Sequence, residues 1–131
     1  MSDLLNFLIE NPTDNLSDEV IISSRLSKFP FKIKAMSGPQ YHEYQRAVTK
    51  VGRKRNVEFN NRLYHELIVL NHTVYPNFRD AESIKKAGCS TPEQFLYRSL
   101  LAGEISELAN KILELSGVGG SLDEDIEDAK N

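Results

Sequence analysis

The sequence is short of the features that mark secreted, membrane-spanning or disulfide-stabilised proteins. Cys89 is the only cysteine among 131 residues, so no disulfide can form within the chain, and a reducing compartment is favoured. No apolar run approaches the roughly 20 residues that span a bilayer. The N-terminal "MSDLLNFLIENP" has an apolar run too short for a signal sequence, and an acidic residue precedes it. We therefore expect a cytoplasmic protein that does not contact membranes.

Motifs of metal and phosphate chemistry are also missing. The sequence contains no HExxH or CxxC pattern, and "SGVGGS" at residues 116–121 lacks the lysine of a phosphate-binding loop. His65 and His72 lie seven residues apart on a predicted helix, which separates them by roughly 10 Å, too far to hold one metal ion. We expect both, and His42, at the surface or its boundary. The sequence therefore predicts no metal site and no cofactor.

The carboxylates and the cysteine give no better support for catalysis. Glu104 and Glu107 lie on a helix face that is predicted to be solvated, where nothing nearby would desolvate them for acid–base chemistry. Cys89 lies just before a helix N-terminus but has no histidine next to it in sequence, so we expect a small buried apolar role. We predict that the protein is not an enzyme.

Acidic residues are concentrated at the two ends of the chain. Residues 1–19 contain five acidic and no basic side chains, and residues 121–131 carry a net charge of −4. Because the whole chain carries −3, its middle carries +6. Solvated ends, or ends that cover a basic face, would explain this pattern. The basic cluster at 50–55 (Lys50, Arg53, Lys54 and Arg55) lacks interleaved aromatic residues, which favours a solvated loop over a nucleic-acid-binding module.

The first part of the sequence predicts a short helix, a linker and a β-hairpin. Residues 3–10 place apolar side chains on adjoining positions ahead of Pro12, as a short helix would. The polar "NPTDNLSD" that follows is typical of a linker. Residues 19–26 and 31–36 then alternate in polarity, most clearly in "FKIKAM", and this alternation indicates strands. With "SKFP" between them, the two runs predict a hairpin over residues 19–36.

The rest of the sequence predicts helices with recognisable ends. Pro39 suits the first turn of one helix, Gly88 suits the end of another, and "STPEQF" contains the residues of a helix cap. Gly103 is expected to kink or break the chain between the last two helices. The predicted helices cover residues of about 39–50, 57–74, 80–87, 92–102 and 103–116.

These elements predict an α+β fold that is predominantly α-helical. An N-terminal β-hairpin precedes a compact bundle of about four to five helices, and the length of the chain suits one domain. We expect a short helix and an acidic linker over residues 1–18, the folded domain over 19–117, and a flexible acidic tail over 118–131.

The stretch "GEISELANKILELSG" at 103–117 has an unusually complete apolar side. At 100° per residue its apolar side chains, with Leu101, fall within an arc of roughly 160°, opposite a charged face. Such an arc suits a helix that packs against the core of its own domain. Alternatively, part of this apolar side is exposed and binds another protein. Leu101, Leu113 and Leu115 at the edges of the arc are the candidate contact residues.

Four parts of the sequence together resemble a known family. They are "PFKIKAMS", "HTVYPNFRDAESIKKAG", "STPEQFLYRSLLAGEISELANKILELSG" and the short acidic tail. In this order they resemble the tail assembly chaperones of long-tailed bacteriophages, above all the XkdN-like chaperones of contractile-tailed phages and defective prophages. The resemblance covers most of residues 1–117.

This resemblance implies a chaperone without enzymatic activity. Members of the family bind the long tape measure protein, keep it soluble, and leave as tail tube subunits take their place. A longer form made by frameshifting is common in related systems and offers a possible contact with the tail tube protein. The resemblance places the protein in the cytoplasm of the bacterial host and not in the mature virion. A structural or connector subunit of the tail, and the nucleic-acid-binding module, stay open as alternatives.

Apolar residues outside the expected core are the candidates for contact with a client protein or with a second copy. The short N-terminal helix could dock on a neighbouring subunit and build a homo-oligomer around the client. The segment "FLYRSLL" and the edges of the last helix are expected to contact the client. The candidate contact residues are Leu4, Phe7, Leu8, Phe95, Leu96, Leu100, Leu101, Leu113 and Leu115.

Overall fold

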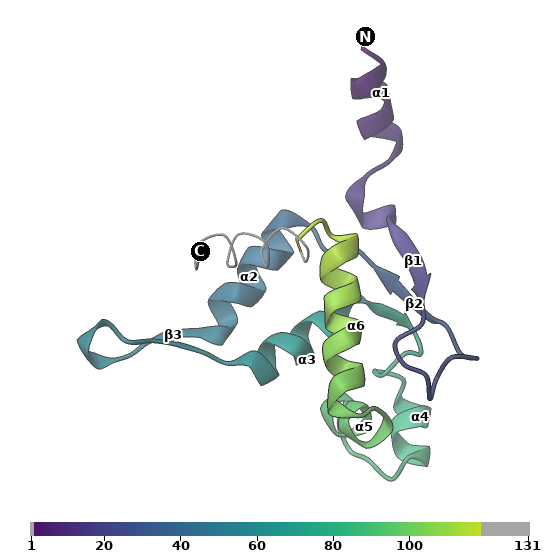
Figure 1. Ribbon diagram of the computed structural model, residues 1–131, viewed down its shortest axis with the longest axis vertical. Helices are drawn as coiled ribbons and strands as arrows, with labels where there is room; N and C mark the ends of the chain where they lie inside the picture. Colours follow the sequence, from purple (N-terminus) through teal and green to yellow (C-terminus); the bar gives the residue numbers. More distant parts are fainter. Residues whose placement is uncertain (1, 119–131) are drawn as a thin grey trace.

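The computed structural model describes residues 2–118, which form two small antiparallel sheets, six α-helices and one hydrophobic core (Figure 1). The fold is α+β and mostly helical, with an N-terminal β-hairpin ahead of the helices, as predicted. Within the same residues, no helix is both long enough and apolar enough to cross a membrane. The elements are α1 (Asp3–Glu10), the 3-10 helix η1 (Thr13–Asn15), β1 (Ser17–Val20), β2 (Phe31–Lys34), α2 (Gly38–Val48), β3 (Thr49–Val51), the 3-10 helix η2 (Arg53–Arg55), β4 (Val57–Phe59), α3 (Asn61–His72), β5 (Thr73–Tyr75), α4 (Ala81–Lys86), α5 (Pro92–Ser99) and α6 (Ala102–Leu115).

The three-stranded sheet has the strand order β1-β2-β5, and both pairs are antiparallel. Because side chains alternate along a strand, β2 buries Phe31 and Ile33 on one face and exposes Lys32 and Lys34 on the other. The alternation predicted for this strand is therefore confirmed. The buried face joins the same core cluster as the apolar side of α6.

The first strand begins earlier and is shorter than predicted. It covers Ser17–Val20, and so it begins inside the segment interpreted as a linker. Residues 21–30 then leave the sheet as a loop, and the prediction of a strand to residue 26 is wrong. The reason is that Ser23 and Arg25 donate side-chain hydrogen bonds to Glu104 of α6, which holds this segment away from β2.

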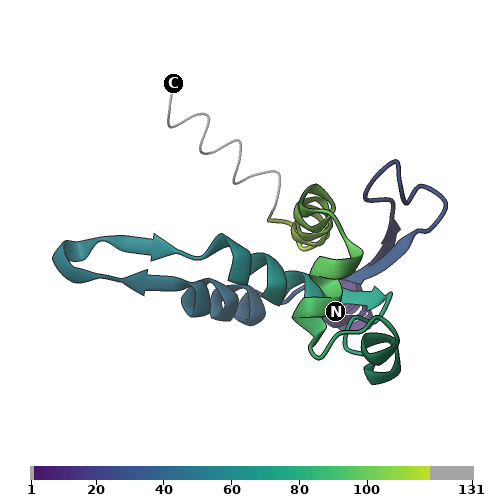
Figure 2. The same cartoon turned by 90° about the horizontal axis from the view of Figure 1, so that it is seen from below.

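A second β-hairpin occupies the place where a solvated loop was predicted. Strands β3 and β4 pair antiparallel, with Val51 opposite Val57, and η2 joins them. Figure 2 shows this ribbon projecting from the body beyond α2 and α3, at the opposite end from the loop between β1 and β2. The helix predicted over 57–74 is too long at both ends, because residues 57–59 pair with β3 and residues 73–75 pair with β2.

Helix caps lie where the sequence places them. Helix α2 has a reciprocal capping box, in which the Gln40 N–H donates to the Ser37 hydroxyl and the Ser37 N–H donates to the Gln40 side chain. At the start of α5 the Thr91 hydroxyl accepts from the Gln94 N–H at 3.1 Å. Gly88 follows α4 with a φ of +75°, the left-handed conformation that glycine adopts at low cost.

The break between α5 and α6 does not lie at Gly103. Helix α5 ends at Ser99, and Gly103 lies in the first turn of α6. The Glu104 side chain fixes this start, because it accepts a hydrogen bond of 2.8 Å from the backbone N–H of Leu101. The predicted break at Gly103 is therefore wrong, because the chain leaves the helical conformation two to three residues earlier, at Leu100 and Leu101.

The core lies between α6, α3 and the inner face of the sheet. Ile105, Leu108, Ala109 and Ile112 of α6 are buried, so the prediction that its apolar arc packs against the domain itself is confirmed. Helix α3 contributes Ile68, Val69 and Leu70 to the same cluster. The main role of α6 is thus to pack the core of its own domain.

His72 belongs to this core, although the sequence predicted a surface or boundary position. It is the last residue of α3, where the chain enters β5, and its side chain is 1% exposed. Its Nε2 atom lies 2.9 Å from the Tyr44 hydroxyl. Burial, with the nearby charge of Lys34, lowers the pKa of His72 to about 4, so the ring is neutral at pH 7. His65 is half-buried, at the boundary as expected.

Candidate protein-binding surfaces

An apolar groove lies between the loop 21–30, the end of β5 and α5. It has a volume of about 310 Å³. Phe29 and Tyr75 are 64% and 68% exposed on its rim, while Phe78 and Phe95 meet edge to face with ring centroids 5.5 Å apart. We call this surface the aromatic groove. Its lining residues are Leu26, Phe29, Pro30, Phe31, Tyr75, Pro76, Phe78, Phe95, Ser99 and Leu100.

One carboxylate anchors the loop that carries Phe29. Glu104 accepts hydrogen bonds from the Ser23 hydroxyl at 2.5 Å and from two nitrogens of Arg25, at 2.6 Å to Nη2 and 3.1 Å to Nε. The same Arg25 Nη2 also donates to the carbonyl of Ser99 at 3.1 Å. These bonds tie the loop to both helices, so they fix one wall of the aromatic groove relative to the other. We call Ser23, Arg25 and Glu104 the loop anchor.

The expectation that Glu104 is solvated is wrong. Its side chain is 4% exposed, because the loop folds over the start of α6. The hydrogen bond from the Arg25 guanidinium, together with those from Ser23 and Leu101, lowers the pKa of Glu104 to about 2 against the opposing effect of burial. The carboxylate is therefore ionised and fully engaged in holding the loop, which leaves it no role as a general acid or base.

Helix α1 forms a second apolar surface. None of its residues is buried, and Figure 1 shows it projecting from the sheet end of the molecule. The Ser2 hydroxyl caps it by accepting from the Leu5 N–H at 3.2 Å. Its exposed apolar residues are Leu4, Leu5, Phe7, Leu8 and Ile9.

The β3–β4 hairpin forms a third surface. Val51, Val57 and Phe59 are 76%, 65% and 45% exposed, and Phe59 meets Tyr64 of α3 edge to face at 5.2 Å. The basic cluster lies in and beside its tip, and Lys54 and Arg55 adopt positive φ angles of 65° and 63°. Sequence reasoning identified the charges of this segment but missed the apolar face beside them.

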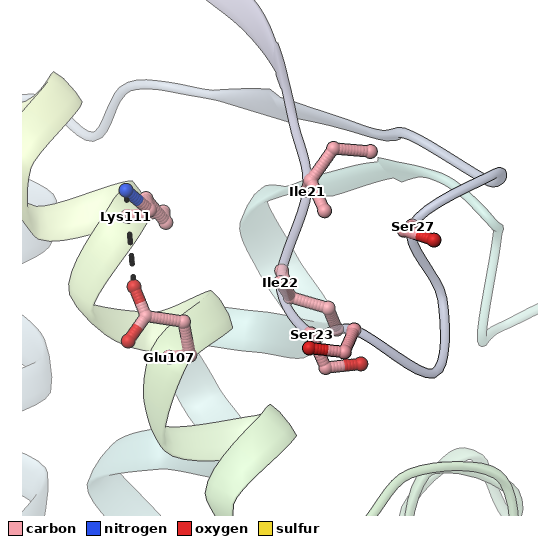
Figure 3. A pocket seen from close by; sticks show the side chains of 7 residues that line it. Ile21, Ile22, Ser23, Ser27, Glu107 and Lys111 are labelled. Atoms are coloured by element: carbon pink, nitrogen blue, oxygen red, sulfur yellow. Dashed lines mark ion pairs between the residues drawn. The ribbon is translucent and has the colours of Figure 1, made fainter.

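A further depression lies between the loop 21–30 and α6 (Figure 3). Ile21, Ile22 and three serines line it, and Glu107 and Lys111 stand on its helix side, 3.8 Å apart. Glu107 and Lys111 form a weak surface ion pair, and the carboxylate beside Ser23 is that of Glu104, which Arg25 already holds, so these groups do not form a catalytic constellation. Among residues 2–118, no group of three histidine, cysteine or acidic side chains is placed to hold a metal ion.

The structure distributes the predicted contact residues over three environments. Leu4, Phe7, Leu8 and Leu101 are exposed, the last by 62%. Phe95 is half-buried in the groove wall, and Leu113 and Leu115 are half-buried against the core. Leu96 of α5 is fully buried, and Leu100, which follows the end of α5, is 8% exposed, so the structure gives these two a packing role in the core.

The most exposed aromatic residues of the groove were missed. Phe29 and Tyr75 each precede a proline, in "KFP" and "VYP", and the first of these segments was predicted only as the turn of a hairpin. An exposed aromatic side chain beside a rigid proline is the signal that could have identified them. Cys89 is half-buried, less so than its expected apolar role implies.

Comparison with known proteins assigns the chain to a family. A model of the phage XkdN-like tail assembly chaperone proteins matches residues 4–130. The chain belongs to this family. The resemblance found from its sequence motifs is thereby confirmed, and the family is one of tail assembly chaperones.

Relatives in Bacillus subtilis (strain 168) agree with this assignment. The uncharacterized protein YqbN is 29% identical over 138 aligned positions, which cover 97% of this chain and 93% of YqbN. Protein XkdN of the phage-like element PBSX is 26% identical over 107 positions, covering 78% of this chain and 72% of XkdN. The crystal structure of YqbN matches with a TM-score of 0.64 at 26% identity, over 89% of this chain and 98% of that one.

Proposed function

We propose that this tail assembly chaperone binds the tape measure protein in the aromatic groove, keeps it soluble and releases it during assembly of the tail tube. The observation that carries this proposal is the exposure of Phe29 and Tyr75 beside the buried floor of the groove. A tape measure protein is expected to be long and helical with apolar stretches. An amphipathic helix places its apolar side chains in such a groove, as helix-in-groove recognition requires.

The size of the groove suits a contact that can be reversed. Full burial of one large apolar side chain contributes about 1.5–3 kcal/mol. Burying the exposed parts of Phe29 and Tyr75 therefore provides a few kcal/mol, before the cost of ordering the client is subtracted. One such contact is weak enough for a tube subunit to displace it. Many copies along a long client would together shield its apolar stretches.

The same proposal sets the place of action. A protein that holds the tape measure protein before the tube polymerises acts in the cytoplasm of the bacterial host and is absent from the finished virion. The loop anchor gives the site its geometry, because Arg25 bonds to Glu104 and to the Ser99 carbonyl at the end of α5, and so fixes the loop that carries Phe29.

Co-expression with the tape measure protein tests the proposal. In a Phe29→Ser, Tyr75→Ser double variant we expect the tape measure protein to leave the soluble fraction and to be lost from pull-downs. Ile21→Ser is the matched control, because Ile21 is also an exposed apolar residue of the loop but lies outside the groove. Thermal midpoints near the wild-type value would show that both variants fold. Undiminished capture of the client by the double variant would contradict the proposal.

A further inference from the structure

The apolar side chains of helix α1 are not covered by the rest of the same molecule. At 100° per residue its five apolar side chains span an arc of about 200°. Asp3, Asn6 and Glu10 occupy the remaining side. A helix of eight residues with this composition is marginal by itself in water, so a partner for its apolar side would stabilise it.

The β3–β4 hairpin has an uncovered surface of matching chemistry. Residues that stand directly opposite in an antiparallel pair point to the same face, so Val51, Val57 and Phe59 share one face, while Lys50 and Glu58 lie on the other. An isolated two-stranded hairpin is at best marginally stable. The hairpin is held at its root, where α2 contacts β3 and Phe59 meets Tyr64 of α3.

The charges of the two surfaces are complementary. Residues 1–19 contain five acidic and no basic side chains. Residues 49–59 contain four basic and one acidic side chain, and the tip holds two of the cations in the left-handed conformation that side chains rarely adopt. Glycine or asparagine would be less strained at those positions, so two cations stand at the tip in spite of a cost in backbone strain.

We propose that α1 of one copy binds the β3–β4 hairpin of a second copy. The apolar side of α1 covers Val51, Val57 and Phe59, and the negative charge of residues 1–19 attracts the basic hairpin without a direct ion pair being required. The dimensions agree, since eight helical residues are about 12 Å long and a three-residue strand is about 10 Å long. The occupant of the hairpin is thus a second copy of this chain.

Because α1 and the hairpin lie in different parts of one molecule, the proposed contact forms between molecules and can recur as further copies are added. In Figures 1 and 2, α1 and the hairpin project from different parts of the body, so they do not meet within a molecule as it is arranged here. A contact between two different surfaces leaves one copy with a free hairpin and the other with a free α1, so further copies can add to form rings or open chains. Each contact is small, and its strength should therefore depend on concentration and salt.

This inference does not depend on the aromatic groove, and its test contains no client. We expect the purified wild-type protein to self-associate in sedimentation velocity experiments at low salt. Reversing the hairpin charges (Arg53→Glu, Arg55→Glu) or the helix charges (Asp3→Lys, Glu10→Lys) should weaken association by at least about tenfold. An equimolar mixture of the two variants, or one chain with all four changes, should restore it. Lys85→Glu, Lys86→Glu on α4 is the control with the same charge change.

Cross-linking detects the contact even when association is weak. In a Cys89→Ser background, Leu8→Cys and Val57→Cys are made in separate chains, and the mixture is treated with a short bis-maleimide. A cross-linked dimer is expected from this mixture and not when Leu101→Cys replaces Leu8→Cys. A mixture without cross-links overturns the proposal, as do cross-links only within a doubly substituted chain. DNA binding that the hairpin reversal abolishes, without self-association, would assign the hairpin to nucleic acid instead.

Discussion

Removing the charge of Glu104 should loosen the aromatic groove through the loop anchor. Glutamine keeps the shape of the side chain, but its amide carries no charge and directs N–H groups at neighbours that are themselves hydrogen-bond donors. Glu104 accepts from Ser23, from two nitrogens of Arg25 and from the Leu101 N–H, and it is almost completely buried. Hydrogen bonds to a charged group are worth about 1.5–3 kcal/mol each. Because Arg25 is half-exposed and can turn to water, we expect a net loss of about 2–3 kcal/mol.

Thermal unfolding measures this loss directly. For a chain of this size, a loss of about 2–3 kcal/mol lowers the thermal midpoint by on the order of 10 °C. The matched control is Glu107→Gln, one turn further along α6, whose carboxylate is partly exposed and lies 3.8 Å from Lys111. Surface pairs of this kind contribute about 0–1 kcal/mol, so the control should unfold close to the wild type.

The pH dependence provides a second readout of the same anchor. The pKa of Glu104 is about 2 in the folded protein, below its ordinary value of 4.5. Its stabilisation is therefore fully present above pH 4.5 and is lost as the pH falls toward 2. Glu104→Gln should lack this part of the acid destabilisation. If Glu104→Gln unfolded at the wild-type temperature with an unchanged pH profile, the loop anchor would have no energetic role, and the reasoning would be refuted.

Three further predictions concern the core and the edges of α6. The buried His72 has a pKa of about 4, so stability should fall by up to about 3 kcal/mol as the pH drops from 6.5 to 4, and His72→Gln should flatten this slope in urea titrations. Leu108→Ala should cost about 2–5 kcal/mol in the same assay, because the residue is fully buried, and a smaller loss would place it outside the core. Leu101→Ser should leave the thermal midpoint unchanged, whereas Leu115→Ser should lower it, because only Leu115 packs against the core. Equal midpoints for these two variants would contradict the difference in burial.

The elements that the sequence predicts well are those whose signals are local. The alternation in β2, the proline in the first turn of α2, the cap at Thr91 and the apolar arc of α6 each lie within a few neighbouring residues. Each signal also agrees with the environment that the fold provides. For this reason the fold class and the identity of the main packing helix follow from the sequence alone.

The elements that the sequence does not predict depend on distant partners. Strands β3, β4 and β5 have three residues each, too few for alternation to be recognised, and only their pairing defines them. Glu104 is predicted to be solvated because its partner Arg25 lies 79 positions earlier in the chain, and the residues around Glu104 give no sign of that contact. The groove likewise combines a turn residue, Phe29, with a strand end, Tyr75, that nothing in the sequence connects.

Site-specific photo-cross-linking in cells that make the tape measure protein tests the central claim most directly. A photoreactive phenylalanine analogue is placed at position 29, 75 or 21, in three separate variants of the chain. The proposed function predicts a cross-linked product with the tape measure protein from positions 29 and 75, and none from position 21, which lies outside the groove. Cross-links from position 21 alone, or from none of the three, would contradict binding of the client in the aromatic groove.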